Sequence, residues 1–242
     1  MIGYGNTHIG QKRSINQDYI FYSDMPVGNL PNLYIVADGM GGHKAGDKAS
    51  SYAVEEFAAK IRNGVKEHPL VLMKDAIESV NEELYALSSS RPEYEGMGTT
   101  FVAATVLDDI LYVMIIGDSR LYVLEEELKQ ITYDHSLVEE LVRKGQLTKE
   151  EARNHPQKNV ITRALGVDGK VNADYFEVEM EHVQMILLCS DGLTNMVTEK
   201  TIQYVLKNAK DMEKATEVLI GLANDNGGLD NISVVIAKKE ER

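Results

Sequence analysis

The stretch from Leu33 to His43 reads Leu-Tyr-Ile-Val-Ala-Asp-Gly-Met-Gly-Gly-His, a short apolar run that stops at a carboxylate and then at glycines. A run of this length bounded by turn residues predicts a buried strand, so we expect Asp38 at the exposed tip of that strand. Glycine lets the backbone turn sharply and brings its carbonyl oxygen close to an ion. The stretch therefore suits a metal ligand, provided that other carboxylates reach the same place.

Composition narrows the class of protein. With 242 residues and a hydrophobic fraction of 43%, we expect one domain over residues 1–242. The formal charge of −13 argues against nucleic acid as the main partner, because proteins that bind phosphate backbones generally carry a basic surface. A single cysteine forms no internal disulfide, and no run approaches the ~18 apolar residues of a membrane span. We therefore expect a cytoplasmic protein, and no sign of oligomerisation leads us to expect a monomer.

Hydrophobic periodicity predicts both helices and strands. Residues 2–24 contain two alternating stretches around a polar loop at 10–14, typical of strand, loop, strand. Helical spacing of apolar residues predicts a pair of helices over 44–62 and 70–87 that packs on a sheet. Further strands are expected over 101–107, 110–116, 120–124, 175–180, 184–188 and 232–237, and further helices over 198–208 and 212–225. Short connections make neighbouring strands antiparallel, so the pattern indicates an α+β layered sandwich.

Between the strands, the segment from Asp134 to Gly169 is polar and contains short amphipathic pieces. This pattern indicates an inserted surface subdomain, and such insertions often carry specificity.

Five aspartates lie at the ends of predicted strands. Asp38, Asp118 and Asp191 each follow an apolar run and stand beside a small residue, Asp230 precedes the last strand, and Asp18 begins an early one. One such aspartate is usually a turn residue, but the repeated context favours a shared site. If the strand ends meet at one edge, repulsion raises the pKa values of the carboxylates and destabilises the fold unless cations bind between them.

Oxygen ligands without clustered cysteine or histidine point to Mg²⁺ or Mn²⁺ rather than Zn²⁺. Two such ions joined by a bridging carboxylate generate hydroxide for in-line attack on phosphorus. Arg13, five residues before Asp18, is placed to supply bidentate bonds to a phosphoryl group. Cys189 lies within an apolar run and is expected to be a buried core thiol, not a nucleophile.

Seven motifs occur in order along almost the whole chain. They are R-S-I-N-Q-D (13–18), D-G-M-G-G-H (38–43), G-M-G-T-T (96–100), G-D-S-R (117–120), D-H-S (134–136), S-D-G-L (190–193) and G-L-D-N-I-S (228–233). Together they resemble the PP2C, or PPM, family of metal-dependent protein serine/threonine phosphatases, and most closely its short bacterial members.

The resemblance implies a four-layer α-β-β-α sandwich, in which helical hairpins flank two mainly antiparallel sheets. It also implies a dinuclear Mn²⁺ or Mg²⁺ centre at one end. Carried over by position, Asp38 bridges the two ions, the Gly39 carbonyl binds one of them, and Asp191 and Asp230 complete the other. Asp118, together with Asp191, matches the third-metal site of bacterial members.

Roles for the reaction follow from the same resemblance. Asp18 would act mainly through metal-bound water, Arg13 would hold the substrate phosphate, and residues 134–166 would form the flap at which protein substrates are selected. The implied reaction is hydrolysis of phosphoserine and phosphothreonine by direct attack of a metal-bridging hydroxide. The expected substrates are phosphoproteins, including a bacterial Ser/Thr kinase that the enzyme opposes.

Two positions depart from the pattern of many eukaryotic members. Those carry D-G-H-G-G, whose histidine is proposed to protonate the leaving alkoxide, whereas here Met40 takes that place and His43 follows three residues later. His43 is thus either the general acid or a surface histidine at a helix start. Gln17 stands where they often carry a metal-binding glutamate, which leaves more of the coordination to water and Asp191.

Two other readings compete. G-M-G-G-H-K at 39–44 opens a helix after a strand, but it lacks the third glycine of a dinucleotide fingerprint, and Asp38 would repel a pyrophosphate. The other is a catalytically weak pseudophosphatase that binds phosphoproteins as a scaffold. Retention of Arg13 and of the metal aspartates argues against that reading.

Overall fold

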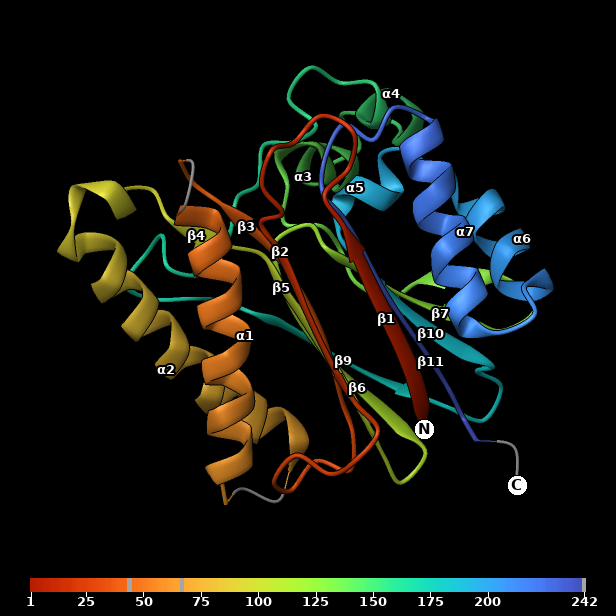
Figure 1. Ribbon diagram of the computed structural model, residues 1–242, viewed down its shortest axis with the longest axis horizontal. Coiled ribbons are helices and arrows are strands. Elements are labelled where there is room, and N and C mark those ends of the chain that lie inside the picture. The colour runs from red at the N-terminus through yellow and green to blue at the C-terminus, as the bar shows by residue number, and fades with distance from the viewer. Residues whose placement is uncertain (43–44, 66–67, 241–242) are drawn as a thin grey trace.

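Helices lie on both sides of a pair of central sheets (Figure 1). The computed structural model describes residues 1–42, 45–65 and 68–240. Within these ranges, no helix has an apolar stretch long enough to cross a bilayer.

The first sheet has strand order β2-β3-β5-β6-β9, and the short β4 pairs with the end of β3. Every pairing is antiparallel. The strands are β2 (Asp18–Ser23), β3 (Leu33–Met40), β4 (Gly98–Thr99), β5 (Phe101–Leu107), β6 (Ile110–Ile116) and β9 (Asp174–Glu179).

The second sheet has strand order β1-β11-β10-β7-β8, again antiparallel throughout. Its strands are β1 (Ile2–His8), β7 (Arg120–Leu124), β8 (Leu128–Gln130), β10 (Met185–Cys189) and β11 (Ile232–Lys238). The chain crosses from the first sheet to the second between β6 and β7, through Gly117, Asp118 and Ser119.

Each sheet is covered by its own helices. α1 (Ala45–Asn63) and α2 (Pro69–Ser90) pack on the first sheet, followed by a 3₁₀ turn at Pro92–Tyr94. α5 (Asp191–Thr194), α6 (Glu199–Asn208) and α7 (Met212–Asp225) pack on the second. α3 (Leu137–Arg143) and α4 (Lys149–Arg153) lie beyond one end of the sheets (Figure 1). The predicted four-layer α-β-β-α sandwich is confirmed.

Side-chain alternation along β3 decides where Asp38 points. Leu33, Ile35 and Ala37 pack against the helices, whereas Tyr34 and Val36 pack in the layer between the two sheets. Successive side chains of a strand point to opposite faces, so Asp38 continues the second set. Its carboxylate therefore lies at the end of the layer between the sheets.

The prediction that Asp38 lies at the exposed tip of its strand is wrong. β3 continues to Met40, because Gly39 and Met40 pair with Thr99 and Gly98 of β4, and Asp38 is only partly exposed. The sequence did not predict β8 or α5 either. These elements have three and four residues, which is too short for a hydrophobic periodicity to show.

The packing of α1 on the first sheet can be tested at Phe57. Its ring is fully buried and meets the ring of Phe101 edge-on, with centroids 5.0 Å apart. Phe57→Ala should lower the free energy of unfolding by about 3–5 kcal/mol in urea denaturation, because it leaves a cavity in this layer. Tyr204→Ala, at a 68% exposed position, should change it by less than about 0.5 kcal/mol. Equal effects would contradict this packing.

Candidate active site

Both sheets contribute aspartates to the same end of the sandwich. Asp18 of β2 and Asp38 of β3 stand directly opposite one another in the antiparallel pairing. Asp191 follows β10 and begins α5, while Asp230 lies just before β11, the neighbour of β10. Asp118 lies in the crossover between the sheets. The carboxylates of the other four all act electrostatically on Asp38.

Burial and like charge change the acidity of these groups. Burial, helped by the neighbouring carboxylates, raises the pKa of Asp38 well above its ordinary value, and the same holds for Asp118. Burial raises the pKa of Asp18 to about 7 and that of Asp191 to about 6, and the Asp230 carboxylate adds to both shifts. The Asp191 carboxylate also acts electrostatically on Asp38. Among the described residues, the one ion pair to any of these five carboxylates is that of Arg13 with Asp230.

Two buried oxygens in this cluster, Oδ1 of Asp18 and Oδ1 of Asp191, have no hydrogen-bond donor among the described residues. The other oxygen of each carboxylate is held: Ser190 Oγ donates to Asp18 Oδ2 at 2.7 Å, and Asn195 Nδ2 donates to Asp191 Oδ2 at 2.9 Å. An unpartnered buried carboxylate oxygen is costly, and a hard cation is the natural partner for a set made only of oxygen. The donor set therefore fits Mg²⁺ or Mn²⁺.

The carboxylates do not form a closed cage. Among the described residues, no three His, Cys, Asp or Glu side chains are already arranged as a metal-ligand set. Mg²⁺ and Mn²⁺ sites commonly complete their coordination with water and backbone oxygen, so the cluster matches an open, partly hydrated site.

Gly39 is required by the close approach of α1 to β3. A Cβ atom at this position would lie 2.0 Å from the carbonyl oxygen of Gly46 and 2.7 Å from that of Gln17. The Gly39 amide already donates to the Gln17 carbonyl at 3.0 Å. Any side chain here would therefore push apart the backbone segments that carry Asp38 and Asp18.

Two hydroxyl groups connect Asp38 to the crossover. The Asp38 amide donates to Thr100 Oγ1 at 3.0 Å, and the Thr100 amide donates to the Asp38 carbonyl at 2.9 Å. Thr100 Oγ1 is in turn 2.7 Å from Ser119 Oγ, next to Asp118. The G-T-T and G-D-S motifs thus hold the backbones of two site aspartates in register.

Arg13 reaches the cluster from the loop between β1 and β2. Its Nη2 donates to Asp230 Oδ2 at 2.7 Å, and about half of its side chain remains exposed. The loop is fixed because the amides of Gln11 and Lys12 both donate to the Gly228 carbonyl. Arg13 also lines a pocket of about 250 Å³ together with Ser14, Ile15, Gln17, Gly41 and Gly42. A guanidinium that is half exposed beside a pocket retains donors for a phosphoryl group.

Asn231 is a buried positioning residue that the sequence analysis missed. Its Oδ1 accepts from the Gln17 amide at 2.9 Å, and its Nδ2 donates to the carbonyls of Ile9 and Ile15 at 2.8 and 3.0 Å. One side chain thus ties the loop of Arg13 to the segment of Asp230. The only sequence signal was an asparagine directly after the last site aspartate, which by itself is typical of a turn.

His135 is a second residue that was missed. It is buried, its Nδ1 accepts from the Gly117 amide at 3.1 Å, and its Nε2 lies 3.1 Å from Asp174 Oδ2. Arg163 Nη1 donates to the other oxygen of Asp174 at 2.8 Å. The two ends of segment 134–166 are therefore fixed to the crossover that carries Asp118 and to strand β9.

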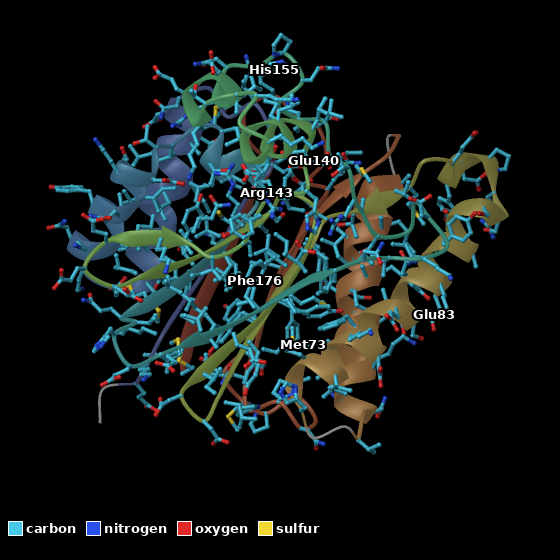
Figure 2. The ribbon with its side chains drawn as sticks, turned by 180° about the vertical axis from the view of Figure 1, so that it is seen from behind. Met73, Glu83, Glu140, Arg143, His155 and Phe176 are labelled. Carbon is cyan, nitrogen blue, oxygen red and sulfur yellow. The ribbon has the colours of Figure 1, made fainter. Side chains whose placement is uncertain are left out.

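The same segment rests on β9 through aromatic rings. The Arg143 guanidinium of α3 lies 5.1 Å from the centre of the Tyr133 ring, and that ring centre lies 5.9 Å from the centre of the Phe176 ring. Arg143 and Phe176 are labelled in Figure 2.

The remaining sequence predictions have mixed outcomes. Cys189 is fully buried against the helices of the second sheet, so the prediction of a buried core thiol is confirmed, and burial raises the pKa of this thiol to about 12. Met40 ends β3, and Gln17 contributes backbone hydrogen bonds to Asn231 and Gly39. His43 lies outside the described residues.

The family model for protein phosphatase 2C matches residues 4–226 of this chain. The chain belongs to the protein phosphatase 2C family. It is therefore a protein phosphatase, and enzymes of this family depend on Mn²⁺ or Mg²⁺. The fold and the oxygen-rich site described above agree with that membership.

Bacterial relatives resemble this phosphatase over most of its length. The serine/threonine phosphatase stp of Listeria monocytogenes is 44% identical over 217 residues, covering 86% of this chain and 84% of the relative. Protein phosphatase PhpP of Streptococcus pneumoniae is 39% identical, covering 97% and 96%. The crystal structure of Stp1 from Staphylococcus aureus is similar, with a TM-score of 0.92 at 36% identity and coverage of 99% and 95%.

The raised pKa values of the site aspartates predict how the stability of the metal-free phosphatase responds to pH. The pKa values of Asp18 and Asp191 are higher in the folded chain than the ordinary 3.8, so the folded state retains protons that the unfolded chain releases between about pH 4 and 7. In EDTA, the free energy of unfolding should therefore fall by roughly 2–4 kcal/mol between pH 5 and pH 8. Asp18→Asn should reduce this fall, and so should saturating Mn²⁺. A flat profile in EDTA would contradict the buried, coupled cluster.

Glycine substitutions test the backbone approach at β3. Gly39→Ala should lower both the free energy of unfolding and the affinity for Mn²⁺, measured by calorimetry, because the added methyl group collides with backbone oxygens. Gly221→Ala is the matched control, since a Cβ atom there meets no atom within 4 Å. Similar losses in both variants would show that close packing at Gly39 is not the cause.

Proposed function

We propose that this phosphatase hydrolyses phosphoserine and phosphothreonine in proteins at a dinuclear Mn²⁺ or Mg²⁺ centre. The observation that carries the proposal is the buried group of aspartates from both sheets, in which Asp18 and Asp191 each keep an oxygen without a donor. The names of the relatives, serine/threonine phosphatase and protein phosphatase, support the same substrate class.

In this proposal Asp38 would contribute to both ion sites, the Gly39 carbonyl to one of them, and Asp191 and Asp230 to the other. Asp118 and Asp191 would hold a third ion. Asp38 lies at the end of the layer between the sheets, and the charges of the other four aspartates all act on its carboxyl group. Both observations support a bridging role for Asp38. When bound, such ions lower the pKa of water and so provide the nucleophile for direct attack on phosphorus.

The protein's own groups position the substrate and the water. Arg13, half exposed beside its pocket, binds the phosphoryl oxygens and exchanges part of its contact with Asp230 for them. Asp18 is oriented by Ser190 through one oxygen, which leaves its other oxygen to orient a water molecule. His43 is our candidate for protonating the departing serine or threonine oxygen, since Met40 offers no exchangeable proton.

The whole chain acts as one catalytic domain in this proposal, and residues 134–166 form a flap that selects substrates. Attachment of this segment to the crossover through His135 supports that role, because it places the flap beside Asp118. We further propose that the enzyme works as a cytoplasmic monomer and that a Ser/Thr kinase is among its substrates.

The metal requirement is the direct test. With Mn²⁺ present, the enzyme should hydrolyse a phosphothreonine peptide. Both EDTA and Asp38→Ala should reduce turnover by more than about a thousandfold, because either change removes the electrostatic stabilisation of the transition state. Asp118→Ala should lower turnover less and raise the Mn²⁺ concentration required. Undiminished turnover in Asp38→Ala, or activity that survives thorough chelation, would contradict the proposed metal-dependent mechanism.

Arg13 and Cys189 separate substrate binding from covalent catalysis. Arg13→Ala should raise KM roughly tenfold with a smaller change in kcat, and Arg13→Lys should recover only part of the loss because lysine cannot form the bidentate contact. Cys189→Ser should retain phosphatase activity, since the thiol is buried against the helices of the second sheet. Loss of chemistry in a folded Cys189→Ser protein would instead indicate a cysteine nucleophile.

A further inference from the structure

A second pocket, of about 480 Å³, lies between the flap and the start of α6. We call it the flap pocket; its walls include Glu139 and Arg153 of the flap, Thr194 and Lys200 around α5 and α6, and the aspartates Asp118 and Asp191. None of these residues lines the pocket of Arg13. The carboxylate cluster therefore has one pocket on the Arg13 side and another on the flap side.

The flap pocket gathers basic side chains in a chain whose formal charge is −13. Lys149, Arg153, Lys158 and Lys200 all line it. Across the described residues, none of these four forms an ion pair. Arg120 also lines the pocket, but its guanidinium is already bound to both oxygens of Asp134 at 2.7–3.1 Å.

The acidic groups of the same pocket have other partners. Asp118 and Asp191 belong to the proposed metal centre, and Asp134 is held by Arg120. Glu139 and Glu199 remain, and Glu199 accepts a long hydrogen bond from the Tyr122 hydroxyl. Lys149 acts electrostatically on Glu139 without forming an ion pair. Apart from the carboxylates of the proposed metal centre and the Arg120–Asp134 pair, the pocket is thus lined by four basic side chains and two acidic ones.

From these observations we propose that the flap pocket binds an acidic segment of the phosphoprotein substrate, adjacent to the residue whose phosphate lies at Arg13. This inference rests on the proposed function and adds a substrate preference to it. Val138, Val142 and Val197 give the pocket apolar wall as well, which suits the aliphatic part of a glutamate or aspartate side chain better than a free inorganic anion.

The size of the effect follows from the exposure of the basic groups. Lys149, Arg153 and Lys200 are exposed, so each contact with a carboxylate is weak and is screened by salt. Several such contacts together should favour an acidic over a neutral peptide by roughly three- to tenfold in kcat/KM at low salt. The preference should shrink in 0.5 M NaCl.

The experiment compares phosphothreonine peptides that differ only in flanking residues, three glutamates against three glutamines, placed either before or after the phosphothreonine. For the Mn²⁺-loaded enzyme, one of the two glutamate peptides should exceed its glutamine counterpart in kcat/KM. The double variant Arg153→Glu/Lys200→Glu should abolish or invert that ratio. Because the ratio is measured within each protein, it does not depend on the fraction that is folded.

The matched control is Lys170→Glu/Lys210→Glu, which changes the net charge equally at exposed positions that do not line the flap pocket. This variant should keep the wild-type ratio. Equal ratios for glutamate and glutamine peptides in the wild type, or the same loss in both double variants, would overturn the inference while leaving the phosphatase activity intact. No turnover of any peptide, or of p-nitrophenyl phosphate, would instead overturn the proposed function and this inference with it.

Discussion

The repulsion among buried carboxylates is the constraint on which the rest of this structure depends. Asp18 and Asp38 stand directly opposite one another on neighbouring strands, an arrangement that is destabilising for like charges. Asp191, Asp118 and Asp230 add negative charge to the same region. Among the described residues, Arg13 pairs with Asp230, and Arg120, whose charge opposes the rise in the pKa values of Asp118 and Asp191, is itself paired with Asp134. Such a cluster is neutralised either by protons, as the raised pKa values of Asp18 and Asp191 indicate, or by external cations.

The sandwich supplies the rigid frame that this cluster needs. Side chains of β3 alternate between the helical layer and the layer between the sheets, which directs Asp38 inward without any special local conformation. Thr100 and Asn231 accept hydrogen bonds from the amides of Asp38 and Gln17, and Ser190 donates one to the Asp18 carboxylate, so both backbone and carboxylate are held in place. These polar groups are buried and hydrogen-bonded, so they fix the strand ends in position against the repulsion between the carboxylates.

Much of this arrangement could be predicted from the sequence, because long apolar periods and repeated Asp-Gly or Asp-Ser turns are local signals. The two helical pairs, most strands and three of the aspartates, Asp38, Asp118 and Asp191, belong to that class. Asp18 and Asp230 are followed by Tyr and Asn and were predicted from their places near strand starts. The extension of β3 past Asp38 was missed because it depends on pairing with β4, which is remote in sequence. Asn231 and His135 were missed for the same reason: their partners at Gln17, Ile9 and Gly117 are contacts of the folded chain, invisible to any spacing rule.

The crossover at Gly117, Asp118 and Ser119 joins the two sheets covalently, yet the site joins them again at the same end. Asp18 and Asp38 come from the first sheet, whereas Asp191 and Asp230 flank strands of the second. An ion bound by aspartates of both sheets would link the two sheets at this end of the sandwich, as a structural metal links the elements of a small domain. Metal binding would then also make local separation of the two sheets less frequent. Amide hydrogen exchange in β2, β3, β10 and β11 would accordingly slow as the site fills with metal.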